Sequence, residues 1–206
     1  MSHYWARFEE IDNNIYRYDT RIYINQIDSI PSDDFCIGAI VGKNPGSAKG
    51  ETSSNLRPIF LDGDKLLPTV RNIMQKSFEL AKINIPKGAY IQVLNLFYLC
   101  EPDLDLAKNE AKTKAINGIC NTEKKYFNFV WFAWGGNDNF LNSYKNRFFS
   151  IQTKRPFYYD YKNNTIQIKI PDEFASVKHT QGLKHDFVVP YIAKLLKTNK
   201  SLERNI

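Results

Sequence analysis

Four clusters of small and polar residues carry the side chains best suited to catalysis, and three of these clusters directly follow an apolar run. The first cluster is a turn after residues 35–41, which reads Gly42-Lys43-Asn44-Pro45-Gly46-Ser47. Pro45 fixes one φ angle and Gly46 permits a positive φ, so the turn is stiff. It can hold the Asn44 carboxamide toward a cleft, where the amide would orient a water molecule. The alternative is an ordinary β-to-α turn in which Asn44 only caps backbone groups.

The second cluster, Asn95-Leu96-Phe97-Tyr98, ends the apolar run 91–94. An amide carries both donors and an acceptor, so Asn95 can pair with the edge of a nucleobase. Phe97 or Tyr98 offers a face on which that base can stack. Core packing explains Phe97 equally well. This cluster is therefore a candidate base pocket.

The third cluster is the end of the apolar run 129–133, where the chain reads Trp134-Gly135-Gly136. Glycine at a strand end lets another backbone or a ligand approach closely. Trp134 and Gly135 are therefore candidate ligand contacts, and the alternative is a sharp turn into the next helix.

The fourth cluster holds two of the three histidines, His179 and His185. A histidine can donate a hydrogen bond or a proton to a leaving group, and the neighbouring Lys178 and Lys184 would attract a phosphate. Loop histidines with satisfied hydrogen bonds are the alternative. A metal site is disfavoured, because only His3 remains and no carboxylate or thiol completes a zinc-like set at local spacing.

Several familiar site motifs are missing from the sequence. The turn at 42–47 lacks the G-x-x-x-x-G-K-[ST] spacing of a phosphate-binding loop and the G-x-G-x-x-G spacing of a dinucleotide site. A serine hydrolase is disfavoured because no G-x-S-x-G elbow is present. We therefore expect no nucleotide cofactor and no metal.

The elements that position these clusters alternate between strand and helix. Apolar runs predict strands over 35–43, 90–99 and 127–136, and apolar residues at helical spacing predict a helix over 64–83. A second apolar stripe predicts a second helix and consists of Leu104, Leu106, Ala107, Ala111, Ala115 and Ile119. A strand or hairpin is expected at 15–24, a hairpin over 156–170 that turns through 162–164, and a final helix over 187–196. This pattern predicts an α/β fold with a mainly parallel sheet covered by helices on both faces. Such a sheet binds its ligand outside the carboxyl ends of its strands.

The composition fits one folded domain over residues 1–206, with a core over 16–196 and a mobile tail over 197–206. Hydrophobic residues make up 43% of the 206 residues, which is ample for a buried core. The three cysteines are widely spaced, so ordinary buried thiols are expected. No apolar stretch is long enough to span a membrane and the first residues show no signal-peptide pattern, so we expect a cytoplasmic protein, as a monomer.

The net charge of +6 is concentrated in the last third of the chain. Residues 143–206 contain 12 Lys and Arg against 5 Asp and Glu. Such an excess suits a surface that faces phosphates, so DNA or a nucleotide is the expected partner. The alternative is a basic surface that only keeps the protein in solution.

Taken in order, the motifs resemble those of the uracil-DNA glycosylase superfamily. VGKNPGS is similar to its first motif, in particular to the mismatch-specific branch, which has Asn-Pro-Gly where the uracil enzymes have Asp-Pro-Tyr. IQVLNLFYL resembles the strand whose terminal Asn reads the pyrimidine edge, and FVWFAWGGND resembles the strand that ends in Trp-Gly. The histidine segment takes the place of the His-Pro-Ser loop.

An uncharacterised bacterial family resembles the chain more closely, over roughly residues 16 to 192. The shared features are a tyrosine like Tyr18, an Asn-Pro turn, a helix start like that at 68–71, an Asn-Leu-Phe strand and a late histidine like His185. In the place of the family's Gly-x-Pro-x-His, this chain has Gly182-Leu183-Lys184-His185.

The resemblance implies a three-layer α/β sandwich that hydrolyses the N-glycosidic bond of a flipped, damaged or modified base without a metal. Asn44 would position the water, Asn95 would recognise the base, Phe97 or Tyr98 would stack on it, and His185 would stabilise the leaving base. The remaining substrate contacts would come from Gly42, Pro45, Gly46, Ser47, Trp134, Gly135, His179 and Lys184.

Three departures from the superfamily pattern keep other functions open. Asn44 is not a carboxylate, Gly46 stands where an aromatic residue is usual, and Asp186 follows His185. The main alternative is a non-catalytic module that binds a nucleotide or nucleic acid on the same fold. A scaffold for protein interactions is a third possibility.

Overall fold

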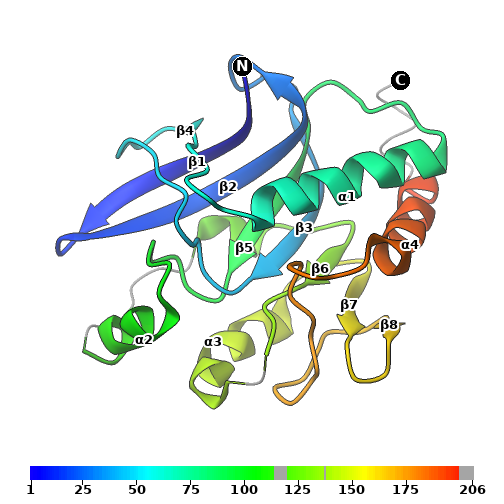
Figure 1. Cartoon of the computed structure of the whole chain (residues 1–206). Helices are drawn as coiled ribbons and strands as arrows, with labels where there is room; N and C mark the ends of the chain where they lie inside the picture. The colour runs from blue at the N-terminus through cyan, green and yellow to red at the C-terminus, as the bar shows by residue number, and fades with distance from the viewer. Residues whose placement is uncertain (114–119, 137, 200–206) are drawn as a thin grey trace.

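The computed structural model describes residues 1–113, 120–136 and 138–199, which form one mixed sheet of eight strands with helices packed against it (Figure 1). The strand order is β4-β1-β2-β5-β3-β6-β7-β8. The strands are β1 (Ser2–Ile11), β2 (Asn14–Ile27), β3 (Phe35–Gly42), β4 (Arg57–Pro58), β5 (Ala89–Asn95), β6 (Val130–Phe132), β7 (Pro156–Asp160) and β8 (Thr165–Gln167). The helices are α1 (Leu66–Ala81), α2 (Leu104–Thr113), α3 (Asn142–Asn146) and α4 (His185–Lys197), and short 3₁₀ turns cover Asn121–Lys124, Asn139–Leu141 and Arg147–Ser150.

The expectation of a mainly parallel sheet is wrong. Among the described strands, β5, β3, β6 and β7 run parallel in the middle, and the four other neighbouring pairs are antiparallel. Two of these four pairs, β1–β2 and β7–β8, are short hairpins, which need only a few turn residues where a parallel pair needs a crossover. The other two pairs, β2–β5 and β1–β4, join strands that are far apart in the chain. The structure is therefore mixed α/β, with a parallel centre and antiparallel flanks.

The long β1–β2 hairpin extends the fold beyond the predicted strand at 15–24. Its two turn residues, Asp12 and Asn13, both have positive φ, as a two-residue hairpin turn requires. β1 contributes Trp5, Ala6 and Phe8 to the core. The folded core therefore starts before residue 16, where the sequence placed its boundary.

Apolar clusters lie on both faces of the sheet. Along β3, Ile37 and Ile40 pack into a cluster with α1 and α4, whereas Ala39 and Val41 belong to a second cluster with one residue of α2 and several from the region of α3. This alternation is what a strand buried on both faces requires. α1 crosses one face of the sheet and α4 lies beside it (Figure 1).

The predicted strands at β3, β5 and β6, the helix at α1, the hairpin at β7–β8 and the helix at α4 are confirmed, although several ends differ by a few residues. The predicted stripe of the second helix is wrong at Leu106, which is 54% exposed, while Ala107 is buried. Ala115 and Ile119 lie outside the described residues.

The predicted tail begins inside the last helix. Lys197 ends α4 and Asn199 is buried, whereas residues 200–206 lie outside the described part of the chain. None of the described helices is long and apolar enough to cross a membrane.

Candidate functional site

The strand order places a crevice at the carboxyl ends of β3 and β6. β3 is the first parallel strand along the chain and β6 the third, and they are neighbours, with the second and fourth parallel strands on their outer sides. The connection that follows β3 therefore runs to one side, toward β5, and the connection that follows β6 runs to the other side, toward β7. Ligands bind in α/β sheets at such a switch point. In Figure 1 the arrowhead of β3 points toward the side on which α2 and α3 lie.

Two adjoining hollows of about 410 and 380 Å³ occupy this place, and we call them together the cleft. Both are lined by Asn44, His179 and Gln181. The first hollow also touches Lys43, Gly135 and Gly136, and the second touches Pro45, Gly46, Ser47, Asp64, Lys65 and Leu66. The predicted turn, the predicted glycines and one of the two predicted histidines therefore meet at one site.

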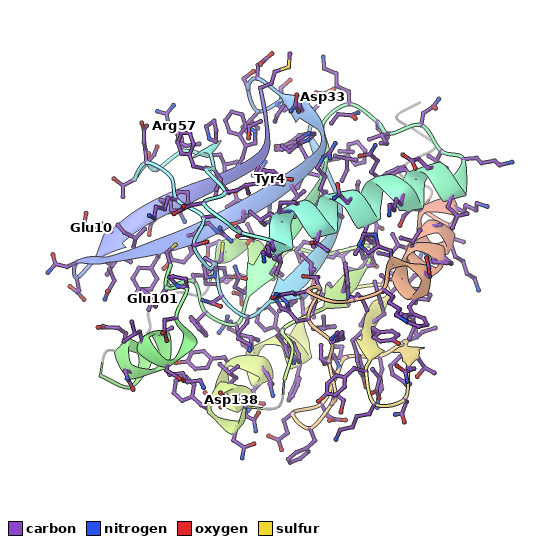
Figure 2. The ribbon with its side chains drawn as sticks, viewed as in Figure 1. Tyr4, Glu10, Asp33, Arg57, Glu101 and Asp138 are labelled. Carbon is purple, nitrogen blue, oxygen red and sulfur yellow. The ribbon has the colours of Figure 1, made fainter. Side chains whose placement is uncertain are left out.

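Asn44 faces the cleft with its orientation fixed. Its Nδ2 donates a hydrogen bond of 2.6 Å to the backbone carbonyl of Glu101. Glu101 is labelled in Figure 2, on the side of the molecule where α2 lies. A carbonyl oxygen only accepts hydrogen bonds, so the amide nitrogen must face Glu101. The Oδ1 atom is therefore the group that Asn44 can offer to a water molecule.

The turn around Asn44 has the predicted stiffness. Pro45 is buried and Gly46 has a φ of +69°. The Ser47 hydroxyl donates to the carbonyl of Asp62 at 2.7 Å, so it braces the turn against the following loop.

His179 is the histidine of the cleft. The backbone of the preceding residue is fixed to β7, because the Lys178 amide donates to the Tyr159 carbonyl at 3.0 Å. The His179 Nδ1 accepts a hydrogen bond from the backbone N–H of Gln181 at 3.1 Å. Nδ1 thus acts as an acceptor, and the neutral ring must carry its proton on Nε2.

The surroundings of His179 keep the ring neutral. Burial lowers the pKa of His179, the positive charges of Lys43 and Lys178 lower it further, and Asp64 offsets part of the effect. At neutral pH the ring therefore presents an Nε2–H donor without a positive charge.

Gly135 allows His179 to approach the end of β6. It has a φ of +68°, and a Cβ added there would lie 2.8 Å from the Cβ of His179. Gly136 has nearly the same φ of +69°, but a Cβ there would meet nothing within 4 Å. The close approach to the histidine thus depends on the first glycine of the pair.

The structure does not bring His185 or Lys184 to the cleft. His185 is the first residue of α4, and its Nδ1 lies 3.2 Å from Lys76 Nζ of α1. Lys184 is exposed just before α4. Because the apolar face of α4 packs on α1, the start of this helix is carried toward α1 and away from the cleft.

Asn95 lies behind the wall of the cleft at the end of β5. Its side chain is buried, and neither Nδ2 nor Oδ1 has a hydrogen-bond partner among the residues that the structure describes. A Cβ at Gly42 would lie 3.0 Å from Asn95 Oδ1 and 3.3 Å from Leu66 Cδ1, and Leu66 lines the cleft. Leaving such a group unpaired costs about 1–3 kcal/mol. The amide is therefore a buried group without a described partner, and it lies close to Gly42 and to the cleft residue Leu66.

The three predicted aromatic contacts are core residues in this structure, and none lines the cleft. The Phe97 ring lies 5.8 Å from that of Tyr144. The Tyr98 hydroxyl donates to Glu123 at 2.5 Å, and Trp134 packs edge-on against Phe132. They form part of the apolar cluster on the face opposite α1.

The ion pair between Arg17 and Asp64, at the start of α1, was not predicted from the sequence. Asp64 Oδ1 accepts hydrogen bonds from the backbone N–H groups of Leu66 and Leu67, at 2.9 and 3.1 Å. Asp64 Oδ2 lies 3.5 Å from a guanidinium nitrogen of Arg17, whose side chain is buried. Burial lowers the pKa of Arg17 and the Asp64 charge counters this shift. The available signals were an Asp just before a helix and an Arg inside an apolar strand.

No three His, Cys, Asp or Glu side chains gather as a metal site within residues 1–113, 120–136 and 138–199. No protein-family model, no curated protein and no solved structure matches the chain.

Proposed function

We propose that the protein hydrolyses the N-glycosidic bond of a nucleotide that has been turned out of a DNA strand. The single observation that carries this proposal is the pair of groups that share the cleft: the Asn44 Oδ1 acceptor and the neutral His179 with its proton on Nε2. A bond of this type breaks when water reaches the sugar and the departing base is stabilised as an anion. An acceptor and a donor in one cleft suit these two tasks.

We assign to Asn44 the role of positioning the attacking water. Its Nδ2 is held by Glu101, so Oδ1 can accept a hydrogen bond from the water and direct an oxygen lone pair toward the sugar carbon. An amide cannot take the proton away, so Asn44 acts by orientation, and the proton passes to solvent. This role is the one that the motif resemblance implies.

We assign to His179, in place of His185, the role of stabilising the leaving base. A neutral Nε2–H stabilises a developing negative charge without first losing a proton, as a preorganised donor in an oxyanion hole does. The negative Asp64, also on the wall of the cleft, suits the positive charge that builds on the sugar. Lys43 and Lys65 line the same cleft and suit the flanking phosphates.

Asn95 is assigned the recognition of the base edge. Both of its amide groups lack protein partners in the described parts of the chain, and Gly42 places no side chain over them. Movement of the Leu66 side chain would open the amide to a base. This assignment explains why a costly buried amide ends β5.

The test is a base-release assay on labelled single-stranded and duplex oligonucleotides that carry uracil, mismatched thymine or other modified bases, followed by alkali to cut abasic sites. Asn44→Ala should reduce single-turnover release by about a hundredfold. Asn146→Ala, at an exposed asparagine of α3, is the matched control and should release bases like the wild type. Intact strands with every base after prolonged incubation would overturn the proposal.

A non-catalytic binding module is the second candidate. It is favoured by the state of Asp64, which is the carboxylate of the cleft lining within the described residues and is already engaged with Arg17 and with the start of α1. This function predicts a salt-dependent gel shift on the same oligonucleotides without base release.

A further inference from the structure

Lys43 is a lysine of the cleft whose backbone is fixed. It follows the last residue of β3, and its carbonyl accepts a hydrogen bond from the Phe97 N–H at 3.3 Å. Its side chain lines the 410 Å³ hollow together with Asn44, Gly135 and His179. The amine therefore shares its space with the two groups assigned to the water and to the leaving base.

The Lys43 amine has no carboxylate of its own. Within the described residues it forms no hydrogen bond or ion pair, and the carboxylate with the largest effect on it is Asp138. Asp138 is already in an ion pair with Lys108, which lies near enough to act on Lys43 as a like charge. Burial lowers the pKa of Lys43, and Asp138 offsets only part of that shift. Burial and the like charge of Lys108 both favour the neutral, nucleophilic amine.

We propose that Lys43 is a nucleophile that forms an imine with the aldehyde of a ring-opened sugar held in the cleft. The chemical class of the substrate is a 2-deoxyribose that has lost its base and retains its flanking phosphates. The inference rests on the proposed function only for the source of this sugar, because removal of a base leaves a C1′ carbon that equilibrates with an aldehyde.

The step balances without a further reactant. The lone pair of the neutral Lys43 Nζ attacks C1′, and the carbonyl electron pair moves to oxygen. The nitrogen then loses one proton to solvent and the oxygen takes one up, which gives a neutral carbinolamine. His179 Nε2–H can donate a hydrogen bond to that oxygen. The hydroxyl then leaves as water after protonation by solvent, and the nitrogen lone pair closes the C=N bond of the iminium ion.

A lysine that only binds phosphate is the competing role for Lys43. Such a lysine is replaceable by arginine, which keeps the charge and binds phosphate at least as well. Arginine forms no stable imine under these conditions. Lys43→Arg therefore separates the two roles, and Lys194→Arg is the matched control because Lys194 is an exposed lysine of α4 that does not line the cleft.

The experiment presents the whole protein with a labelled oligonucleotide in which one abasic site has been made beforehand, in the presence of sodium borohydride. Hydride adds to C1′ of an iminium ion and leaves a stable secondary amine between protein and DNA. The wild type and Lys194→Arg should give a covalent adduct on a denaturing gel, and Lys43→Arg should give about tenfold less or lower. Peptide mass spectrometry should locate the adduct on Lys43.

Several outcomes would overturn the inference: no adduct from the wild type, an equal adduct from Lys43→Arg, or an adduct on another residue. A gel shift on the same abasic strand without borohydride shows that Lys43→Arg still folds and binds. Because the abasic site is supplied, an adduct from a protein that releases no base would support the imine chemistry and reject the proposed function. Base release without an adduct would do the reverse.

Discussion

Replacement of Gly135 by alanine should reduce both catalysis and stability, whereas replacement of Gly136 should reduce stability and leave most of the activity. Gly135 and Gly136 both have a φ near +70°, so alanine at either position costs about 1–2 kcal/mol of backbone strain. Only at 135 does the new Cβ meet a neighbour, at 2.8 Å from the His179 Cβ, where ordinary contacts begin near 3.4 Å. The histidine must therefore move by about half an ångström or more, and this overpacking adds about 1–3 kcal/mol.

The expected loss of activity follows from the position of the His179 donor. A displacement of about 1 Å at a reacting centre costs roughly a hundredfold in rate, and loss of an oxyanion-type donor costs about a hundredfold to a thousandfold. Gly135→Ala should therefore lower single-turnover base release by about a hundredfold. Gly136→Ala carries the same strain without the collision, and it should retain most of its activity.

Two assays separate these effects. Urea unfolding should show that both variants are folded and that Gly135→Ala is the less stable of the two. Base release measured well below the unfolding midpoint should then distinguish them. If Gly135→Ala and Gly136→Ala release bases at the same rate, the position of His179 does not matter for the chemistry and the proposed mechanism is refuted. A nitrogen NMR spectrum of the histidine rings gives a reading independent of activity, since displacement of His179 should weaken the hydrogen bond at Nδ1.

Three further predictions concern the charges and the buried amide. Because the pKa of His179 is lowered in the folded protein, the unfolded chain binds the proton at a higher pH than the folded chain does. The free energy of unfolding should therefore fall as the pH drops from 6.5 to the folded-state pKa. Urea unfolding midpoints of His179→Gln should show less of this fall. Asn95→Leu should raise the free energy of unfolding by about 1–3 kcal/mol while it abolishes base release, and a destabilised variant would contradict the view that the amide is unpaired. Asp64→Asn should cost about 3–5 kcal/mol because it leaves Arg17 buried without a counter-charge, and Arg17→Met in the same chain should recover part of this loss in urea unfolding.

Local patterns predicted the elements whose identity depends on neighbouring residues. The run that forms β3 and the helical spacing of α1 are visible in the sequence, and the stiff turn at Asn44 follows from its proline and glycine. The direction of each strand depends on partners far along the chain, and for this reason the antiparallel flanks were not foreseen. β1 was missed because charged residues such as Arg7 and Glu9 interrupt its apolar pattern.

The sequence predicted those parts of the candidate site that depend on which residues directly follow each strand. Asn44 and Gly135 end neighbouring strands, so their meeting follows from a parallel centre of the sheet. The choice between His179 and His185 depends on where α4 begins and on which helix it packs. The ion pair of Arg17 with Asp64 joins residues 47 positions apart. Each residue is unusual in its local pattern, but no local pattern predicts that the two side chains pair.

The antiparallel pairing of β2 with β5 also affects how the chain folds as it is made. The β1–β2 hairpin has a two-residue turn and can close early. The other edge of β2 stays unpaired until β5 has been synthesised, and one contact between these strands, from the Gln92 side chain to the Thr20 carbonyl, joins residues 72 positions apart. At ribosomal rates of synthesis, the stretch of chain from Thr20 to Gln92 takes roughly 4 to 15 s to make. Throughout this time, β2 presents unpaired backbone groups beside apolar side chains such as Ile22 and Ile24, which is a surface on which nascent chains aggregate. Slower synthesis of the first ninety or so residues should therefore lower the soluble yield of this protein.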